Sequence, residues 1–232
     1  MRQMAQITAD ELLAAARAEI GTKEQPQNSN RVKYNTAFYG REVSGAAYPW
    51  CVTFIWWLFW KLGAAELFCG GQKTASCGVV MDYAKKHSQF VTEEYRPGDL
   101  VLLRFQSSGG PQHIGLVSQV RSDGSLETIE GNTGQDSDAN GGQVQQRVRE
   151  KRLAVGAYRP AYREVSKSVT YERLKDIPEK FRQTIEKLMD IGVIQGDGSD
   201  PEGNGDVISL THEQVRTLTF TVRLLERFGL YL

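Results

Sequence analysis

This chain has little cysteine and little histidine. Its 232 residues include three cysteines: Cys51, Cys69 and Cys77. The three histidines are His87, His113 and His212. So few cysteines argue against a disulfide framework and for synthesis in a reducing compartment. They also leave few candidates for a nucleophilic thiol with a base beside it.

The chain also lacks net charge and long apolar runs. It has 28 Lys and Arg residues against 28 Asp and Glu residues, so nothing suggests a general attraction to nucleic acid or to anionic membranes. The apolar run at 54–62 is far shorter than the roughly 20 residues of a membrane helix. The first 21 residues carry acids early and have no apolar core followed by a cleavage site. We therefore expect no signal peptide.

The first 160 residues are predicted to form helices first and strands afterwards. Helices are expected at 8–20, after a capping box at Thr8–Glu11, at 51–62 and at 77–88, with a surface loop at 22–35. After the Pro97-Gly98 turn, short apolar runs alternate with Gly-Gly and Asp-Gly turns. That pattern is typical of an antiparallel meander. The fold class is therefore predicted to be α+β.

A second, smaller unit is predicted at the C-terminal end. The first domain is expected to span residues 1–162, and residues 163–172, which have no apolar run, are predicted to form a linker. Residues 173–232 show two helical patterns, the second after a capping box at 211–214, separated by a long turn at 196–206. About 60 residues is close to the lower size limit for folding alone, so this unit could pack on the first domain or on another copy.

Cys51 is the most informative residue. It follows Tyr48-Pro49 and begins an apolar run that ends at Gly63. Because proline suits an N-cap or first-turn position, Cys51 is expected in the first turn of a buried helix. The unsatisfied N–H groups and the helix dipole there favour the thiolate, which is the reactive form. The alternative is a small apolar residue packed in a core.

A nucleophilic cysteine needs a base and a group that orients the base. His113 begins the run HIGLVSQV, and the next run, LETIEGN, places Glu130 and Asn132 two residues apart on one face. If the two runs pair around the Asp123-Gly124 turn, Glu130 comes close to His113. The two arms of the hairpin differ in length, so the pairing requires a bulge or a diagonal contact.

Four segments in this order resemble the CHAP family of peptidoglycan-cleaving cysteine peptidases and amidases. They are YPWCVTF, RPGDLVLL, QHIGLVSQV and LETIEGNTG. The resemblance covers about residues 10–160 and implies a papain-like α+β fold. It also implies that Cys51 is the nucleophile, His113 the base, Glu130 the residue that orients His113, and Asn132 an accessory polar group.

The neighbours of Cys51 suggest substrate contacts and no metal. We expect Tyr48 and Trp50 to bind substrate, with Trp50 at a cleft wall. Some phage lysins of the family bind calcium through an Asp-x-Asp loop before the cysteine, but GREVSGAAYPWC has no such motif. We therefore expect neither calcium nor a cofactor. Cys69, Cys77 and His87 match no common zinc spacing, so the two cysteines are interpreted as spare thiols.

The C-terminal unit resembles a single S-layer-homology-type module, on the segments LKDIPEKFRQTIEKLMDIGVIQGDG and LTHEQV. His212 stands where such modules usually have arginine. The resemblance implies attachment to cell-wall polymers, with self-association or simple packing as alternatives. A catalytic domain, a wall-directed module and no export signal together resemble a phage or prophage endolysin. Such enzymes accumulate in the host cytoplasm and reach the wall after membrane permeabilisation.

Two classes of function remain open at this stage. The first is a peptidoglycan hydrolase, either an N-acetylmuramoyl-L-alanine amidase or a crossbridge endopeptidase, with peptidoglycan as its partner and neither nucleic-acid binding nor membrane insertion. The second is a catalytically silent wall-binding or assembly protein on a CHAP-like scaffold. The presence of Cys51, His113 and Glu130 favours the hydrolase. Bond choice depends on groove shape, which the sequence does not give.

Overall fold

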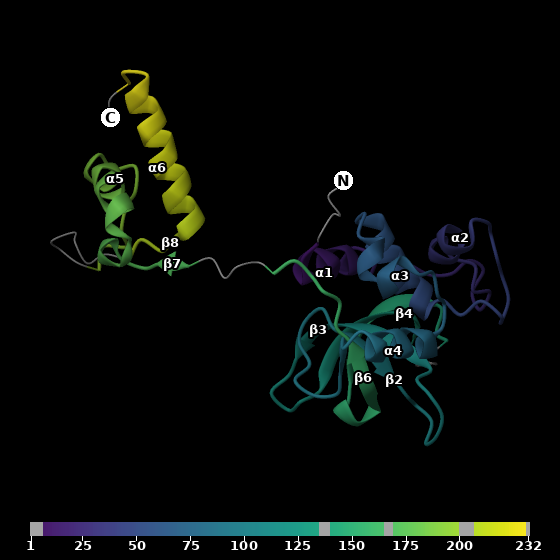
Figure 1. The fold of residues 1–232 in the computed structure, drawn as a ribbon. Coiled ribbons are helices and arrows are strands. Elements are labelled where there is room, and N and C mark those ends of the chain that lie inside the picture. Colours follow the sequence, from purple (N-terminus) through teal and green to yellow (C-terminus); the bar gives the residue numbers. More distant parts are fainter. Residues whose placement is uncertain (1–6, 135–139, 165–168, 200–206, 231–232) are drawn as a thin grey trace. The chain divides into compact units, whose positions relative to one another are not determined.

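The chain forms two compact units, residues 1–164 and 165–232 (Figure 1). The computed structural model describes residues 7–134, 140–164, 169–199 and 207–230. The predicted turn at 196–206 therefore lies partly outside the described residues. Among the residues described, no helix combines the length and apolarity needed to cross a membrane.

The first unit places four helices before an antiparallel sheet, so the α+β prediction is confirmed. The helices are α1 (Ala9–Arg17), α2 (Lys33–Tyr39), α3 (Cys51–Lys61) and α4 (Cys77–Lys86). The strands are β1 (Phe90–Val91), β2 (Leu100–Leu103), β3 (His113–Val120), β4 (Leu126–Thr133), β5 (Gln143–Arg149) and β6 (Ala154–Tyr158). They form one sheet in the order β1-β6-β2-β3-β4-β5. Short 3-10 turns cover Ala65–Leu67, Cys69–Gly71 and Lys151–Leu153.

Helix α3 is the centre of the first unit. Every residue from Cys51 to Phe59 is buried, which explains why its apolar run has almost no polar interruption. Helices α1 and α2 contact α3, and so do strands β3 and β4. The helix and the sheet come very close at Gly131, where an added Cβ would lie 2.7 Å from Cβ of Phe54. This close approach fixes the height of α3 above the sheet.

The two faces of the sheet have different roles. Ile114, Leu116 and Ile129 belong to the large core that holds α3. Val117 and Leu126 belong to a smaller core that includes Val101 and Leu103. Since side chains alternate along a strand, His113 and Gly115 share the face of Val117, and Glu130 shares the face of Leu126.

The segment at 22–35 differs from the surface loop that the sequence predicts. Helix α2 begins at Lys33, and Glu24, Asn30 and Asn35 are all buried. The carboxylate of Glu24 accepts a hydrogen bond from the backbone N–H of Asn30, and Asn35 Nδ2 donates to the carbonyl of Asn30 at 2.9 Å. A polar sequence here holds a folded segment together, because its side chains satisfy buried backbone groups.

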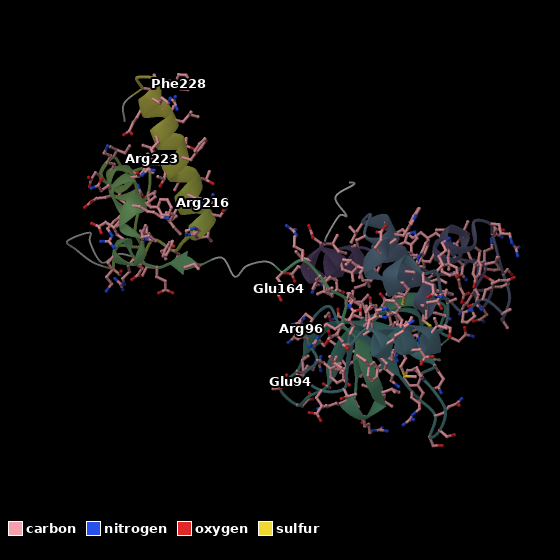
Figure 2. All side chains as sticks on the ribbon, in the orientation of Figure 1. Glu94, Arg96, Glu164, Arg216, Arg223 and Phe228 are labelled. Carbon is pink, nitrogen blue, oxygen red and sulfur yellow. The ribbon has the colours of Figure 1, made fainter. Side chains whose placement is uncertain are left out.

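The second unit is a helical pair with a short two-stranded sheet. Strand β7 (Thr170–Tyr171) lies in the segment expected as a linker and pairs with β8 (Leu210–Thr211). A 3-10 turn (Leu174–Asp176) leads to α5 (Glu179–Asp190), which packs against α6 (His212–Arg227). The predicted capping box at Thr211 is present, with the hydroxyl accepting from the N–H of Gln214. Arg216 and Arg223 lie along α6, and Phe228 follows its last residue (Figure 2).

We expect Gly131→Ala to destabilise the first unit, because its methyl group would overlap Phe54 across the helix–sheet contact. Overpacking of this kind costs about 1–3 kcal/mol of unfolding free energy. Gly110→Ala is the matched control, since an added Cβ there meets nothing within 4 Å. Denaturant unfolding followed by circular dichroism compares the two variants, and equal stabilities would contradict the close contact.

Candidate active site

Cys51 is the first residue of α3, and Trp50 is the N-cap. The prediction that a proline occupies the cap or the first turn is wrong by one position, since Pro49 precedes the N-cap. The Trp50 side chain makes no capping hydrogen bond. No side chain therefore caps the first N–H groups of α3, and the backbone N–H of Val52 is directed at the Cys51 sulfur. Cys51 itself is 5% exposed.

A network from α2 fixes the chain that leads to Cys51. Asn35 Nδ2 donates to the carbonyl of Tyr48 at 2.9 Å, and Thr53 Oγ1 donates to Asn35 Oδ1 at 2.7 Å. Both Asn35 and Thr53 are fully buried. These bonds tie α2 to the residues on either side of Cys51. Sequence reasoning missed Asn35, because the segment around it was expected to be a loop.

His113 and Glu130 meet at the middle of the sheet, as the sequence predicts. His113 Nε2 lies 3.0 Å from Glu130 Oε2, and both side chains are fully buried. Strands β3 and β4 contain a register shift between Val117 and Gln119, so the expected bulge is present. An added Cβ on Gly115 would lie 2.9 Å from Cγ of Glu130. A glycine at this position leaves the carboxylate room to extend toward His113.

The contact with Glu130 decides which nitrogen of His113 faces Cys51. Nε2 is occupied by the carboxylate, and Nδ1 is buried without a hydrogen-bond partner in the described part of the chain. Although Nδ1 makes no hydrogen bond of good geometry, Cys51 lies close enough for a thiolate and an imidazolium to stabilise each other. Nδ1 is therefore the nitrogen that can exchange a proton with Cys51.

Cys77 is a member of the site that sequence reasoning missed. It is the first residue of α4, is buried in the same core as Cys51, and lies close enough for its thiol to stabilise a Cys51 thiolate. The interaction with Cys77, together with the nearby His113, holds the pKa of Cys51 well below its ordinary value, although burial acts in the opposite direction. The pKa of Cys77 is raised well above its ordinary value for the same reason. No sequence spacing brings these two helix starts together.

The pKa values of His113 and Glu130 are also shifted. Burial lowers the pKa of His113, but Cys51 and Glu130 outweigh burial and raise it to about 9. Burial raises the pKa of Glu130, but hydrogen bonds from Arg149 and His113 outweigh it and lower the pKa to about 2. Near neutral pH the favoured state therefore has a Cys51 thiolate, a His113 imidazolium and a Glu130 carboxylate.

Asn132 lies two residues beyond Glu130, yet strand alternation does not set its direction. Its φ of +58° is in the left-handed region, and the β4–β5 pairing shifts register between Glu130 and Thr133. The expectation that Asn132 and Glu130 share a face therefore does not follow from a regular strand. Asn132 Nδ2 donates to Asn140 Oδ1 at 3.2 Å. Its Oδ1 is buried and has no hydrogen-bond partner among the residues described.

The two residues predicted to contact substrate differ in burial. Trp50 is fully buried and its ring packs against Tyr34 at a centroid distance of 5.4 Å, so it is a core residue and not an exposed cleft wall. An apolar ring beside a helix start is buried here because α2 covers it. Tyr48 is half-buried, with its ring 5.1 Å from that of Tyr39.

Two surface hollows are lined by other residues than these. One has a volume of about 460 Å³ and is lined by residues between 22 and 42, and the other has about 380 Å³ and is lined by residues between 181 and 223. Neither includes Cys51 or His113. Across the described ranges, no group of three or more His, Cys, Asp or Glu side chains is arranged to hold a metal ion.

We expect the three thiols to differ sharply in reactivity toward iodoacetamide. Cys51 is held as a thiolate, whereas burial alone raises the pKa of Cys69 to about 12 and Cys77 is also shifted upward. At pH 6.5, peptide mass spectrometry of the folded protein will find label on Cys51 well before the other two. Equal labelling of Cys51 and Cys69 would contradict the site as described.

Removing the Cys77 thiol should make Cys51 less acidic. At a pH well below the wild-type midpoint, the alkylation rate of Cys51 in Cys77→Ala is expected to fall about tenfold, which corresponds to a rise of about one pKa unit. Cys77→Ser keeps a hydroxyl that can donate to Cys51, so its alkylation rate should fall less than that of Cys77→Ala. Cys69→Ala removes a buried thiol that has no bond to Cys51 and should leave the rate unchanged. A Cys77→Ala rate equal to wild type would show that the donor has no effect.

The comparisons with known proteins concern the same part of the chain. Residues 43–132 match the family model of the CHAP domain. Comparisons with curated proteins and with solved structures find no match. The matched segment contains Cys51, His113, Glu130 and Asn132, and it ends before β5. CHAP domains are generally hydrolases that act on peptidoglycan, so the match supports a CHAP-family protein of the cysteine- and histidine-dependent hydrolase type.

Proposed function

We propose that this chain hydrolyses an amide bond of bacterial peptidoglycan, as an N-acetylmuramoyl-L-alanine amidase or a crossbridge endopeptidase, with Cys51 as nucleophile. The observation that carries the proposal is the grouping of three side chains. Cys51 begins a helix, and it borders a His113 whose far nitrogen is bound to Glu130 at 3.0 Å. This is the arrangement of nucleophile, base and orienting group that acyl transfer through cysteine requires.

The reaction follows from the charge state of the site. The Cys51 thiolate attacks the amide carbon and forms a C–S bond, while the carbonyl oxygen becomes an oxyanion. Backbone N–H groups at the start of α3 are placed to stabilise that oxyanion. The His113 imidazolium gives its proton to the nitrogen of the leaving amine, the C–N bond breaks, and an acyl-thioester on Cys51 remains.

The second half of the reaction uses the same residues in reverse. Neutral His113 takes a proton from water, and the hydroxide attacks the thioester carbon. The C–S bond breaks and Cys51 leaves as a thiolate, with the proton kept on His113. Glu130 remains a carboxylate throughout and holds Nε2–H, so that Nδ1 faces the reacting atoms. In this proposal Asn132 is an accessory polar group whose buried Oδ1 provides one more acceptor near the site.

For the second unit, the proposed role is attachment to cell-wall polymers, as the S-layer-homology resemblance implies. Tyr171 Oη lies 2.7 Å from Nδ1 of His212, so the residue that replaces the usual arginine is engaged in the fold. Together with the hydrolase, this role corresponds to an endolysin of phage or prophage type. It would accumulate in the host cytoplasm and act on the wall after release.

Digestion of purified peptidoglycan tests the proposed activity. Wild type should release soluble fragments, and Cys51→Ala should retain less than about one-thousandth of that rate, because the nucleophile is lost. Cys69→Ala is the matched control and should be fully active. Mass spectrometry separates the two bonds: free stem peptides mean an amidase, and new amino termini within crosslinks mean an endopeptidase.

Two results would overturn the proposal. Cell-wall lysis by Cys51→Ala at the wild-type rate would exclude Cys51 as nucleophile. No release by wild type from walls of several species, with binding retained, would indicate the catalytically silent wall-binding protein.

The pH dependence of wall clearing should report His113. The active state needs the imidazolium, whose pKa is raised to about 9, so initial rates should fall as the pH rises through about 9. Glu130→Gln removes the negative charge that favours the imidazolium, and the alkaline limb should then move down toward 6.5. Glu127→Gln changes a carboxylate of the same strand that pairs with Arg121 and should leave the limb in place. If Glu130→Gln leaves the alkaline limb of the pH profile where it is in wild type, the proposed effect of Glu130 on the pKa of His113 is contradicted.

A further inference from the structure

Arg149 is a buried cation on strand β5. It ends β5, which is an edge strand of the sheet, and it is 3% exposed. Arg149 Nε donates to Glu130 Oε1 at 2.8 Å, and Nη2 donates to Glu130 Oε2 at 2.6 Å. A guanidinium that binds both oxygens of one carboxylate fixes the plane and position of that carboxylate.

With Arg149 bound, each oxygen of the Glu130 carboxylate accepts two hydrogen bonds. Oε2 receives both Arg149 and the Nε2–H of His113, and Oε1 receives Arg149 and the hydroxyl of Thr128, which donates at 2.5 Å. The Arg149 guanidinium lies 5.1 Å from the ring centroid of Phe105, whose ring is 5.9 Å from that of His113. Arg149 therefore touches the surroundings of His113 from two sides.

The charges of this group sum to zero only when Arg149 is counted. The Cys51 thiolate and the Glu130 carboxylate carry two negative charges, and the His113 imidazolium carries one positive charge. Cys77 of α4, which also faces Cys51, stays a neutral thiol. A buried group with one unbalanced negative charge is unfavourable, and it regains balance by taking up a proton. Arg149 provides the missing positive charge without being able to lose a proton.

We propose that Arg149 is a positioning residue of this site: it fixes the Glu130 carboxylate against His113 and balances the charge that lets Cys51 remain a thiolate. The inference rests on the proposed role of Cys51 as nucleophile. Arg149 lies outside the segment that matches the CHAP domain, residues 43–132. A purely structural ion pair would stabilise β5 against β4 without changing the ionisation of Cys51.

The test compares Arg149→Met, Arg149→Lys and the double variant Arg149→Met with Glu130→Gln. Arg147→Met is the matched control, because Arg147 lies two residues earlier on the same strand and donates to the carbonyl of Gly134 and to Gln145. The first readout is the pH profile of Cys51 alkylation by iodoacetamide, followed by peptide mass spectrometry. The second readout is fragment release from purified peptidoglycan, and thermal unfolding checks that each variant is folded.

In Arg149→Met the alkylation midpoint of Cys51 should rise by about one pH unit, a loss of about tenfold in rate at a pH well below both midpoints. Arg149→Lys keeps the charge and should stay near wild type in this profile, while losing part of the wall activity because lysine cannot bind both oxygens. The double variant removes one charge of each sign, so its midpoint should fall back below that of Arg149→Met. Arg147→Met should behave as wild type.

An unchanged midpoint in folded Arg149→Met, or an equal rise in Arg149→Lys, would overturn the inference. If Arg149→Met does not fold, Arg149→Lys provides the test, because it keeps the charge and loses the two-point contact with Glu130. Its wall activity must then fall while its Cys51 midpoint stays near that of wild type, and full wall activity would overturn the inference. A wild type that shows the expected profile but releases no fragments would refute the proposed function and leave the role of Arg149 standing.

Discussion

The buried contact between His113 and Glu130 is the interaction on which the rest of the site depends. Both side chains are fully buried, and a histidine in such a place would ordinarily be neutral. The carboxylate keeps the imidazole charged and directs its free nitrogen to Cys51. The carboxylate in turn remains ionised because Arg149 and Thr128 donate to it. The reactivity of Cys51 thus depends on His113, on Glu130 behind it, and on the residues that donate to Glu130.

Close packing between α3 and the sheet brings these groups to one place. Phe54 rests on the backbone of Gly131, and the absence of a side chain at Gly115 gives Glu130 its room. Side chains at these two positions would lift the helix or turn the carboxylate away from His113. The approach of α3 to the sheet and the position of the Glu130 carboxylate therefore each depend on a glycine, and the two glycines lie in adjacent strands.

The sequence was sufficient for the parts of the site that local patterns encode. The apolar run after Cys51, the hairpin around Asp123-Gly124 and the bulge that its unequal arms require are all properties of neighbouring residues. Cys77 and Arg149 could not be found in this way, because each meets the site only through tertiary packing. Arg149 also belongs to a strand rich in polar residues, and the sequence does not distinguish a buried arginine there from an exposed one. Trp50 was misplaced since an aromatic residue beside a nucleophile fits a core as well as a groove.

The same dependence on packing makes the ionisation of Cys51 a measure of the folded state. Its thiolate is stabilised by the start of α4, by the first residue of β3 and, through Glu130, by the last residue of β5. The contact from Cys77 is lost if α4 detaches, and the contact from Arg149 is lost if β5 detaches, so in either case Cys51 becomes a less acidic thiol. A free, highly reactive cysteine is hazardous in an unfolded chain, where it can be oxidised or cross-linked. Building its reactivity from distant segments confines that reactivity to the assembled domain.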